Sequence, residues 1–241
     1  MFSNSNTIIF AFKPILMESF GSKMNIKVNS NVFIKSPEST DLGRNIVSGS
    51  IDLIENLGFE GFTFKKLAKY ISSTEASVYR YFESKNHLLT YLVLWYWGWQ
   101  EYRLVMSIVN IDCAKERLKR SITVLTERIE KDSDFSQIDE IKLNKIVIAE
   151  SSKIYFNKDV DEDNKLGFFS QYKEVVQRVS DIVNEINPTF KYPHMLVSTV
   201  IEGAHHQRYF AEHLPRLTDV VEGEDAVSNF YVELVFNEID R

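Results

Sequence analysis

Residues 63–89 read TFKKLAKYISSTEASVYRYFESKNHLL, and this stretch decides the fold. Thr63 stands directly before an apolar run that ends near Ile71, which is the position and the residue type of a helix N-cap. Three hydroxyl residues at 72–74 then break the run, because such side chains satisfy free backbone groups at a turn and at a new helix start. A second short helix is predicted over residues 75–82. Two short helices joined by a tight turn are typical of a helix-turn-helix.

The flanking sequence extends the helical pattern in both directions. Upstream, apolar residues at helical spacing predict one amphipathic helix over residues 40–57, ended by Gly58. Downstream, Ser84 caps a long helix that begins at Lys85 and carries one apolar stripe to Met106. Further helical segments are expected at residues 114–131, 139–156, 165–186, 193–213 and 225–239. No strand-like alternation is visible, so the sequence predicts an all-α protein with a three-helix N-terminal head and a larger helical body.

The charge of the chain is unevenly distributed. The net charge is −6, yet residues 23–90 hold nine Lys and Arg against seven Asp and Glu, while residues 91–241 hold 18 against 26. This asymmetry suits a head that meets phosphate groups and a body that avoids them.

The cysteine content, the apolar runs and the N-terminal residues indicate the cellular compartment of the chain. A single cysteine, Cys113, excludes an intramolecular disulfide and a cysteine-rich zinc site, which favours a reducing cytoplasm. The longest apolar run, residues 91–99, is about half the length that a membrane span needs. The first 24 residues lack a basic start and a small-residue cleavage site. We therefore expect a disordered or irregular extension over residues 1–37, with a true start at Met24 as an open alternative.

The run from Arg44 to Leu89 resembles the signature of the TetR family of bacterial transcription regulators. In that signature a helix with an aliphatic-Ala pair is followed by a turn, a Tyr-x-x-Phe recognition helix and a Ser-Lys-x-x-Leu-Leu start to the next helix. Those positions are filled here by Tyr79, Phe82, Ser84, Lys85, Leu88 and Leu89. The resemblance implies a helix-turn-helix DNA-binding domain over residues 38–89 and a helical effector-binding and dimerisation domain over residues 90–241. Beyond Leu89 only the helical pattern agrees.

The resemblance also implies which side chains meet DNA. Contacts to the sugar-phosphate backbone fall on Thr63, Thr74, Tyr79 and Lys85. Hydroxyls and amides at helix N-termini bind phosphate oxygens, and a lysine there adds a point charge. Base reading falls on Ser73, Ser77 and Arg80, with Arg80 best suited to a guanine edge. Tyr81 is expected to touch a thymine methyl group or to stack along the backbone.

Three positions depart from the family pattern. Ser72 and Ala76 stand where many members have glycine, and Glu75 stands where Lys or Arg is frequent. A carboxylate beside phosphates weakens binding unless it accepts from a cytosine amino group or points away, so the operator sequence stays open. An alternative is that Tyr79 and Phe82 only fill the core of a helical domain that does not bind DNA. In that case the hydroxyl and basic residues of the motif would occur at these positions by chance.

Aromatic residues crowd the helix that follows the head, with all three tryptophans at positions 95, 97 and 99. In TetR-like proteins this helix connects the head to the ligand pocket, so a ligand that presses on it can swing the head. Candidate effector-pocket residues are Trp95, Trp99, Tyr102, Phe169, Tyr172 and His206. Such a lining suits a flat or apolar effector, and packing of a helical core is the alternative for each residue.

Four of the five histidines lie within residues 194–213, which raises the question of a metal site. His205 and His206 are adjacent and therefore point about 100° apart on a helix, and neither has a histidine at i+4 as a helical zinc pair would. We expect no metal and no cofactor.

The last two predicted helices carry apolar arcs too wide for a helix with one solvated side. The resemblance implies that they form a four-helix bundle with a second copy, and an intramolecular core is the alternative. A two-fold dimer implies a palindromic operator on double-stranded DNA. The expected function is a repressor that a small-molecule effector releases from this operator, with no membrane partner.

Two alternatives to this function stay open. One is a TetR-like regulator that answers to a protein partner, which would have a filled body. The other is a helical enzyme or ligand carrier with a structural head. Against an enzyme, the sequence shows no Ser-His-Asp set, glycine-rich phosphate loop or metal-ligand spacing.

Overall fold

The computed structural model describes residues 26–130 and 138–240, so residues 1–25 of the extension expected at residues 1–37 lie outside the described residues. Within the described ranges the chain is all-α, as predicted, and contains no strand. The helices are α1 Asp41–Gly61, α2 Phe64–Tyr70, α3 Glu75–Tyr79, α4 Lys85–Ile108, α5 Ala114–Thr126, α6 Glu140–Glu150, α7 Ser152–Tyr155, α8 Val160–Lys165, α9 Ser170–Ile186, α10 Pro193–His213 and α11 Ala226–Ile239. None of these helices is long and apolar enough to cross a membrane.

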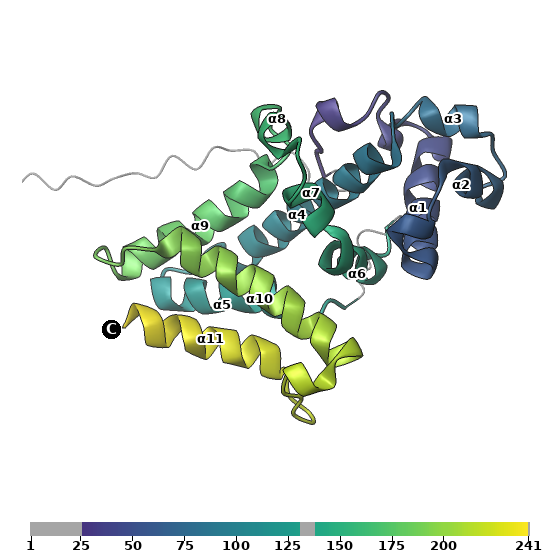
Figure 1. Cartoon of the computed structure of the whole chain (residues 1–241). Helices are drawn as coiled ribbons and strands as arrows, with labels where there is room; N and C mark the ends of the chain where they lie inside the picture. Colours follow the sequence, from purple (N-terminus) through teal and green to yellow (C-terminus); the bar gives the residue numbers. More distant parts are fainter. Residues whose placement is uncertain (1–25, 131–137, 241) are drawn as a thin grey trace, which may run out of the picture.

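The helices form a small head and a larger body. Helices α1, α2 and α3 lie together at one end, and α4 runs from them into the body (Figure 1). There α4 packs against α5 and α9, while α10 packs against α9 and α11. Helices α10 and α11 lie side by side on the near face of the body, with the C-terminus at the end of α11 remote from the head (Figure 1).

Helix α4 is buried on nearly all sides along its first half. The sequence predicted one apolar stripe, but every residue from Leu88 to Trp97 is buried, Thr90 among them. A helix that is apolar all round belongs in the centre of a domain, and α4 takes that place because α5, α6 and α9 pack around it. Most of its aromatic side chains therefore pack in the core.

Several predicted boundaries change in the structure. Gly58 does end the regular part of α1, because its φ of 69° and ψ of 162° lie outside the helical region. The polar stretch 157–164, predicted as a connector, contains α8, and Gly167 with φ 80° separates α8 from α9. Helix α8 buries none of its residues, so it carries no apolar periodicity that could have predicted it.

Residues 26–36, here called the strap, pack along the molecule before α1 begins. Their only regular structure is the 3-10 turn η1 Ser30–Val32, and Val32 is completely buried. Ile26 is also buried, and it lies so close to α4 that a Cβ at Gly98 would come within 2.5 Å of the Ile26 Cγ2. A second 3-10 turn, η2 Pro37–Ser39, then leads into α1. This part of the predicted N-terminal extension is irregular but packed.

Candidate nucleic-acid interface

Each helix of the head begins at a hydroxyl side chain that accepts a hydrogen bond from its own first turn. Thr40 accepts from the Gly43 amide at 3.0 Å, and Thr63 from the Lys66 amide at 3.2 Å. Thr74 accepts from the Ser77 amide at 3.2 Å, and Ser84 from the His87 amide at 3.3 Å. An N-cap of this type contributes about 1 kcal/mol to helix stability. These caps fix where each short helix starts, and so fix the geometry of the helix-turn-helix.

Apolar residues on the inner sides hold the three helices together. Leu67 of α2 and Val78 of α3 are fully buried, and so is Phe82 after α3. Helices α1 and α2 approach closely at Gly49, where an added Cβ would come within 2.7 Å of the Ile71 Cγ2. These residues form a small apolar core, and the polar side of α3 is left facing outward.

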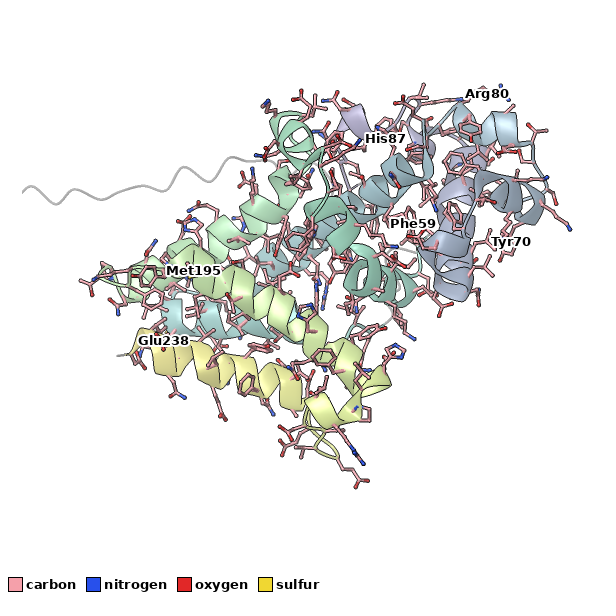
Figure 2. All side chains as sticks on the ribbon, viewed as in Figure 1. Phe59, Tyr70, Arg80, His87, Met195 and Glu238 are labelled. Atoms are coloured by element: carbon pink, nitrogen blue, oxygen red, sulfur yellow. The ribbon has the colours of Figure 1, made fainter. Side chains whose placement is uncertain are left out.

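The outward side of the helix-turn-helix presents Thr63, Thr74, Tyr79 and Arg80 to solvent. Tyr79 is 48% exposed and its ring packs edge-on against Phe64, with 5.0 Å between ring centroids. Arg80 lies at the outer edge of the head, far from Glu238 at the end of α11 (Figure 2). Ser73 in the turn is half-buried. These side chains occupy the positions that the sequence assigned to DNA contact.

Ser77 and Tyr81, which the resemblance assigned to contact with DNA, do not face outward in this structure. Ser77 is 7% exposed, and its Oγ lies 2.8 Å from the Thr74 Oγ1 and accepts from the Arg80 Nη2 at 2.9 Å. Tyr81 is 4% exposed because its hydroxyl bonds to the Thr40 Oγ1 at 2.7 Å and the strap covers it. Ser77 therefore orients Arg80, and Tyr81 anchors the end of the recognition unit.

Lys85 is partly engaged within the protein. Its Nζ donates to the Phe59 carbonyl at 3.1 Å, lies 4.5 Å from the centre of the Phe59 ring, and is 3.8 Å from a Glu60 carboxylate oxygen. The lysines beside the fully exposed Glu60, Lys153 first and Lys85 after it, hold the pKa of its carboxyl below the usual value. A phosphate would have to compete with these partners for Lys85.

Basic residues on α2 were not assigned to the interface from the sequence. Lys65 and Lys69 are exposed on this helix, and Lys66 donates to the Gly61 carbonyl at 2.6 Å. The signal that could have found them is their position: they follow Thr63 at the start of the helix that crosses the DNA backbone in a helix-turn-helix.

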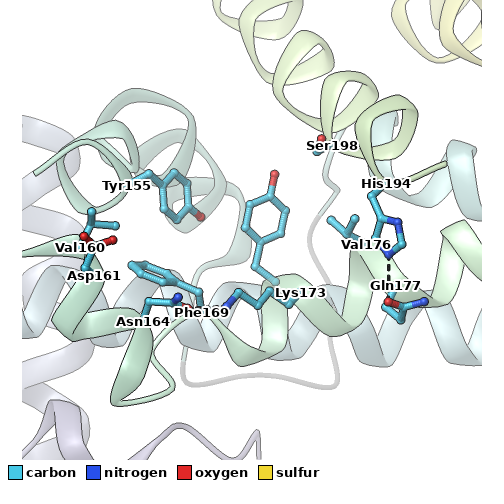
Figure 3. Close-up of a pocket in the computed structure, with 11 residues that line it drawn as sticks. Tyr155, Val160, Asp161, Asn164, Phe169, Lys173, Val176, Gln177, His194 and Ser198 are labelled. Carbon is cyan, nitrogen blue, oxygen red and sulfur yellow. Dashed lines mark hydrogen bonds between the residues drawn. The ribbon is translucent and has the colours of Figure 1, made fainter. Parts of the chain in front are cut away.

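The body contains a pocket of about 510 Å³ between α7, α8, α9 and α10. Figure 3 shows Tyr155 and Phe169 at one end of it and His194 with Gln177 at the other. The lining residues are Tyr155, Val160, Asp161, Asn164, Phe169, Tyr172, Lys173, Val176, Gln177, His194 and Ser198. This volume lies within the range of small-molecule sites.

A stack of aromatic rings backs this pocket. Tyr172 stacks on Trp97 of α4 with 4.1 Å between ring centroids, and the Trp97 Nε1 donates to the Tyr155 hydroxyl at 2.7 Å. The Tyr172 hydroxyl donates to Glu202 at 2.8 Å. Burial raises the pKa of both tyrosine hydroxyls, so they stay protonated at neutral pH. The pocket floor is therefore aromatic and directly connected to α4.

Two of the six expected pocket residues, Phe169 and Tyr172, line this pocket. Trp95 and Trp99 are buried in the core instead, and Tyr102 packs at its edge. His206 is exposed and stacks on Phe210, outside the pocket. These four residues therefore do not line this pocket; three of them lie on α4, which packs at the centre of the body.

A second hollow, of about 10 Å³, lies deeper in the body beside His205. The Gln100 Nε2 donates to the Tyr96 hydroxyl at 2.7 Å, and that hydroxyl donates to Asn144 at 3.0 Å. Such a volume is about the size of one water molecule. His205 is 7% exposed, and burial lowers its pKa from 6.5 to about 4. Within the described residues, no group of histidine, cysteine and carboxylate side chains is placed to hold a metal ion.

Helices α10 and α11 divide their apolar residues between core and surface. Val197, Val200 and Ile201 are buried within the chain, as are Val227, Tyr231 and Val235. Met195, Phe230 and Leu234 remain 65%, 56% and 38% exposed. The apolar arcs are thus partly intramolecular core, and these three residues form an exposed apolar face, the α10–α11 face.

Comparison with known proteins matches residues 46–92 to the family model described as bacterial regulatory proteins, tetR family. A comparison with curated proteins gives no match. Among solved structures, AibR in complex with isovaleryl coenzyme A and operator DNA is 14% identical, with TM-score 0.55 over 81% of this chain and 99% of that chain. The superantigen PfiT is also 14% identical, with TM-score 0.56 over 85% of this chain and 98% of that one. A tetR family transcription regulator from Shewanella sp. PV-4 is 13% identical, with TM-score 0.56 over 80% and 95% of the two chains.

These structural likenesses concern the fold of head and body together, whereas the family model matches the residues that form most of α1, all of α2 and α3, and the start of α4. Residues 46–92 are thus similar to the tetR family of bacterial regulatory proteins, and most of the chain is similar in fold to the solved structures named above.

Proposed function

We propose that the chain acts as a homodimeric repressor that binds a palindromic operator and leaves it when a small molecule occupies the body. The observation that carries this proposal is the exposure of Thr74, Tyr79 and Arg80 on the outer side of a helix-turn-helix whose inner side is packed. In this division of labour residues 38–89 bind DNA, and residues 90–241 bind the effector and the second subunit. Binding to bacterial chromosomal DNA would place the chain in the cytoplasm.

The proposed contacts fall into two kinds. Arg80, oriented by Ser77, can donate two parallel hydrogen bonds to a guanine edge in the major groove. Thr63, Thr74, Tyr79 and the exposed Lys65 would contact phosphate groups, which position the head without reading sequence. Lys85 would join them only by leaving Phe59. Ser73 at the turn stays a candidate for base contact.

Replacing Arg80 by alanine should remove base discrimination without abolishing DNA binding. Selection of random duplexes with the full-length protein defines the preferred site, and competition titrations then compare it with variants of each base pair. A bidentate contact contributes about 1–3 kcal/mol, so preference at one guanine per half-site should fall by about 5- to 150-fold.

Arg216 supplies the matched control, because it is an exposed arginine in the body. Arg216→Ala should leave the preference unchanged. Lys65→Ala should weaken binding to all duplexes and lower the slope of log affinity against log salt by about one. Unchanged discrimination by the Arg80 variant would remove Arg80 from the site.

The effector is proposed to bind in the 510 Å³ pocket, against the rings of Tyr155, Phe169 and Tyr172. An aromatic wall with Lys173 at its rim suits a flat or apolar molecule that carries an anionic group. AibR, a neighbour in fold, is described with isovaleryl coenzyme A and operator DNA, so acyl coenzyme A thioesters are sensible first candidates. Population shift requires that the effector binds the DNA-incompetent state more tightly by a few kcal/mol.

Filling this pocket should abolish effector binding. A ligand at a hundred times its Kd stabilises the folded state by about 2.7 kcal/mol, which raises the Tm by about 5–10 °C for a chain of this size. Ser198→Trp places a large side chain in the pocket and should remove that shift, whereas Ser48→Trp, at a partly exposed site on α1 outside the pocket, should retain it. If acyl thioesters and aromatic acids leave the wild-type Tm unchanged, a protein partner becomes the better hypothesis.

A further inference from the structure

The strap joins the rim of the body pocket to the recognition unit of the head. At its body end, the Asn29 Nδ2 donates to the Leu166 carbonyl at 2.9 Å, and the Asn31 Nδ2 reaches the same oxygen at 3.4 Å. The Gln171 Nε2 donates to the Lys27 carbonyl at 3.3 Å. The strap is thus bound to the segment between α8 and α9.

This α8–α9 segment forms one side of the body pocket. Asn164 and Phe169, which line the pocket, flank Leu166 at a distance of two and three residues. Gly167 has φ 80°, and a Cβ there would lie 3.1 Å from the Asn29 Nδ2. The strap therefore lies against the back of the segment whose other side a ligand would touch.

At its other end the strap holds the residue that ends the recognition unit. The Ile34 amide donates to the Tyr81 carbonyl at 2.8 Å, and the Lys35 Nζ lies 5.3 Å from the centre of the Tyr81 ring. Between the two ends, Val32 is completely buried and Phe33 packs edge-on against Tyr91 of α4. Because these central residues of the strap are packed in the core, a movement at one end of the strap is transmitted to the other end.

We infer that Asn29 is a positioning residue for DNA binding, which ties the α8–α9 rim of the pocket to the recognition helix through the strap. This inference rests on the proposed function and names how the pocket regulates the head. A ligand that displaces residues 164–169 would pull the Leu166 carbonyl from Asn29 and loosen the strap at Tyr81. The strap acts in parallel with α4, and it reaches the C-terminal end of the recognition unit directly.

A pair of substitutions at Ile34 isolates the contact at the head end. The Ile34 side chain is 65% exposed, so truncating it costs little packing. Ile34→Pro removes the amide that donates to Tyr81, and Phe33 already has the extended conformation, φ −142° and ψ 151°, that a residue before proline prefers. Ile34→Ala keeps the amide and serves as the matched control.

Amide hydrogen exchange on the full-length protein measures transmission without a ligand. Asn29→Ala and Ile34→Pro should each speed exchange in residues 75–82 roughly three- to tenfold, because each removes a link that restrains the recognition unit. Ile34→Ala should leave exchange in 75–82 unchanged, and so should Asn229→Ala, which removes an exposed amide side chain on α11. Exchange in α9 should be unaffected by all four substitutions.

If Asn29→Ala changes exchange only in residues 26–36 and 164–168, the strap is a local structural element and the inference is overturned. The exchange measurement contains no DNA, so it decides the inference even if the chain selects no duplex. Failure of the wild-type protein to select any duplex would overturn the proposed function separately. With a selected duplex in hand, Asn29→Ala should weaken its binding about three- to tenfold while preserving base preference, which a base-contacting residue would not do.

Discussion

Replacing Phe230 and Leu234 together by glutamate should convert the protein from a dimer to a monomer and weaken operator binding by at least about 100-fold. Both side chains lie on the α10–α11 face, where they are 56% and 38% exposed. Because they contribute little to the core of their own chain, the double variant should keep its fold. Four carboxylates brought together across a two-fold axis would strongly oppose association.

The loss of affinity follows from losing the second head. Two half-sites bound by one dimer gain an effective concentration that raises affinity by a factor of about 10² to 10⁴ over a single head. Light scattering after gel filtration should give the mass of one chain, 28.1 kDa, for the variant and twice that mass for the wild type. Titration of the selected duplex measures the affinity.

Phe156 provides the matched control for this pair. It is a phenylalanine at the end of α7 with 87% exposure and is not part of the α10–α11 face. Phe156→Glu should leave both the mass and the affinity unchanged. A double variant that stays dimeric would show that the α10–α11 face is not where the two copies meet.

The sequence predicted the head well because its signals are local. Thr63 and Ser84 were identified as caps from their place before apolar runs, and both accept the expected amide hydrogen bond. The two short helices expected before Ile71 and over residues 75–82 likewise correspond to α2 and α3. Caps and short-range periodicity depend on residues a few positions apart, so no tertiary information is needed to read them.

The orientation of Ser77 and Tyr81 was missed because it depends on distant chain. The strap covers Tyr81, and nothing in the helical period of residues 75–82 indicates that residues 34 and 35 will lie over it. A five-residue helix also gives too short a pattern to separate its inner face from its outer one. In the structure Ser77 is buried and accepts a hydrogen bond from Arg80, so it orients Arg80 and is not exposed beside it.

The body pocket shows the same limit. The sequence analysis placed Trp95 and Trp99 in the effector pocket because tryptophans are abundant on α4. In the structure α4 is a central helix, and these side chains pack in the core. Phe169 and Tyr172, which were expected in a pocket, do line this one, whereas further lining residues come from α7, α8 and α10 and were not expected there. Which aromatic residue lines a cavity is decided by how helices far apart in sequence meet.

Protonation of His205 should destabilise the protein as the pH falls from 7 to 5. Burial against the rings of Tyr96 and Trp97 disfavours the charged imidazolium, which lowers the pKa from 6.5 to about 4 in the folded state. Between these two values the unfolded chain binds more protons than the folded chain, so stability is complete above pH 6.5 and is lost as the pH falls. The expected loss between pH 7 and pH 5 is about 2 kcal/mol.

Chemical denaturation at pH 7, 6 and 5 measures this loss, and a comparison of variants assigns it to His205. Two partly buried carboxyls act in the opposite direction: partial burial raises the pKa of Glu38 and of Asp163, so these carboxyls favour the folded state at low pH. His205→Gln should therefore flatten or reverse the slope of stability against pH, while His194→Gln, at an exposed position on the same helix, should retain it. An equal slope in the wild type and in His205→Gln would show that His205 does not resist protonation in the folded protein. If the slope is confirmed, the core beside α4 disfavours charged groups. A ligand bound at the neighbouring aromatic wall would then act on α4 through packing and not through charge.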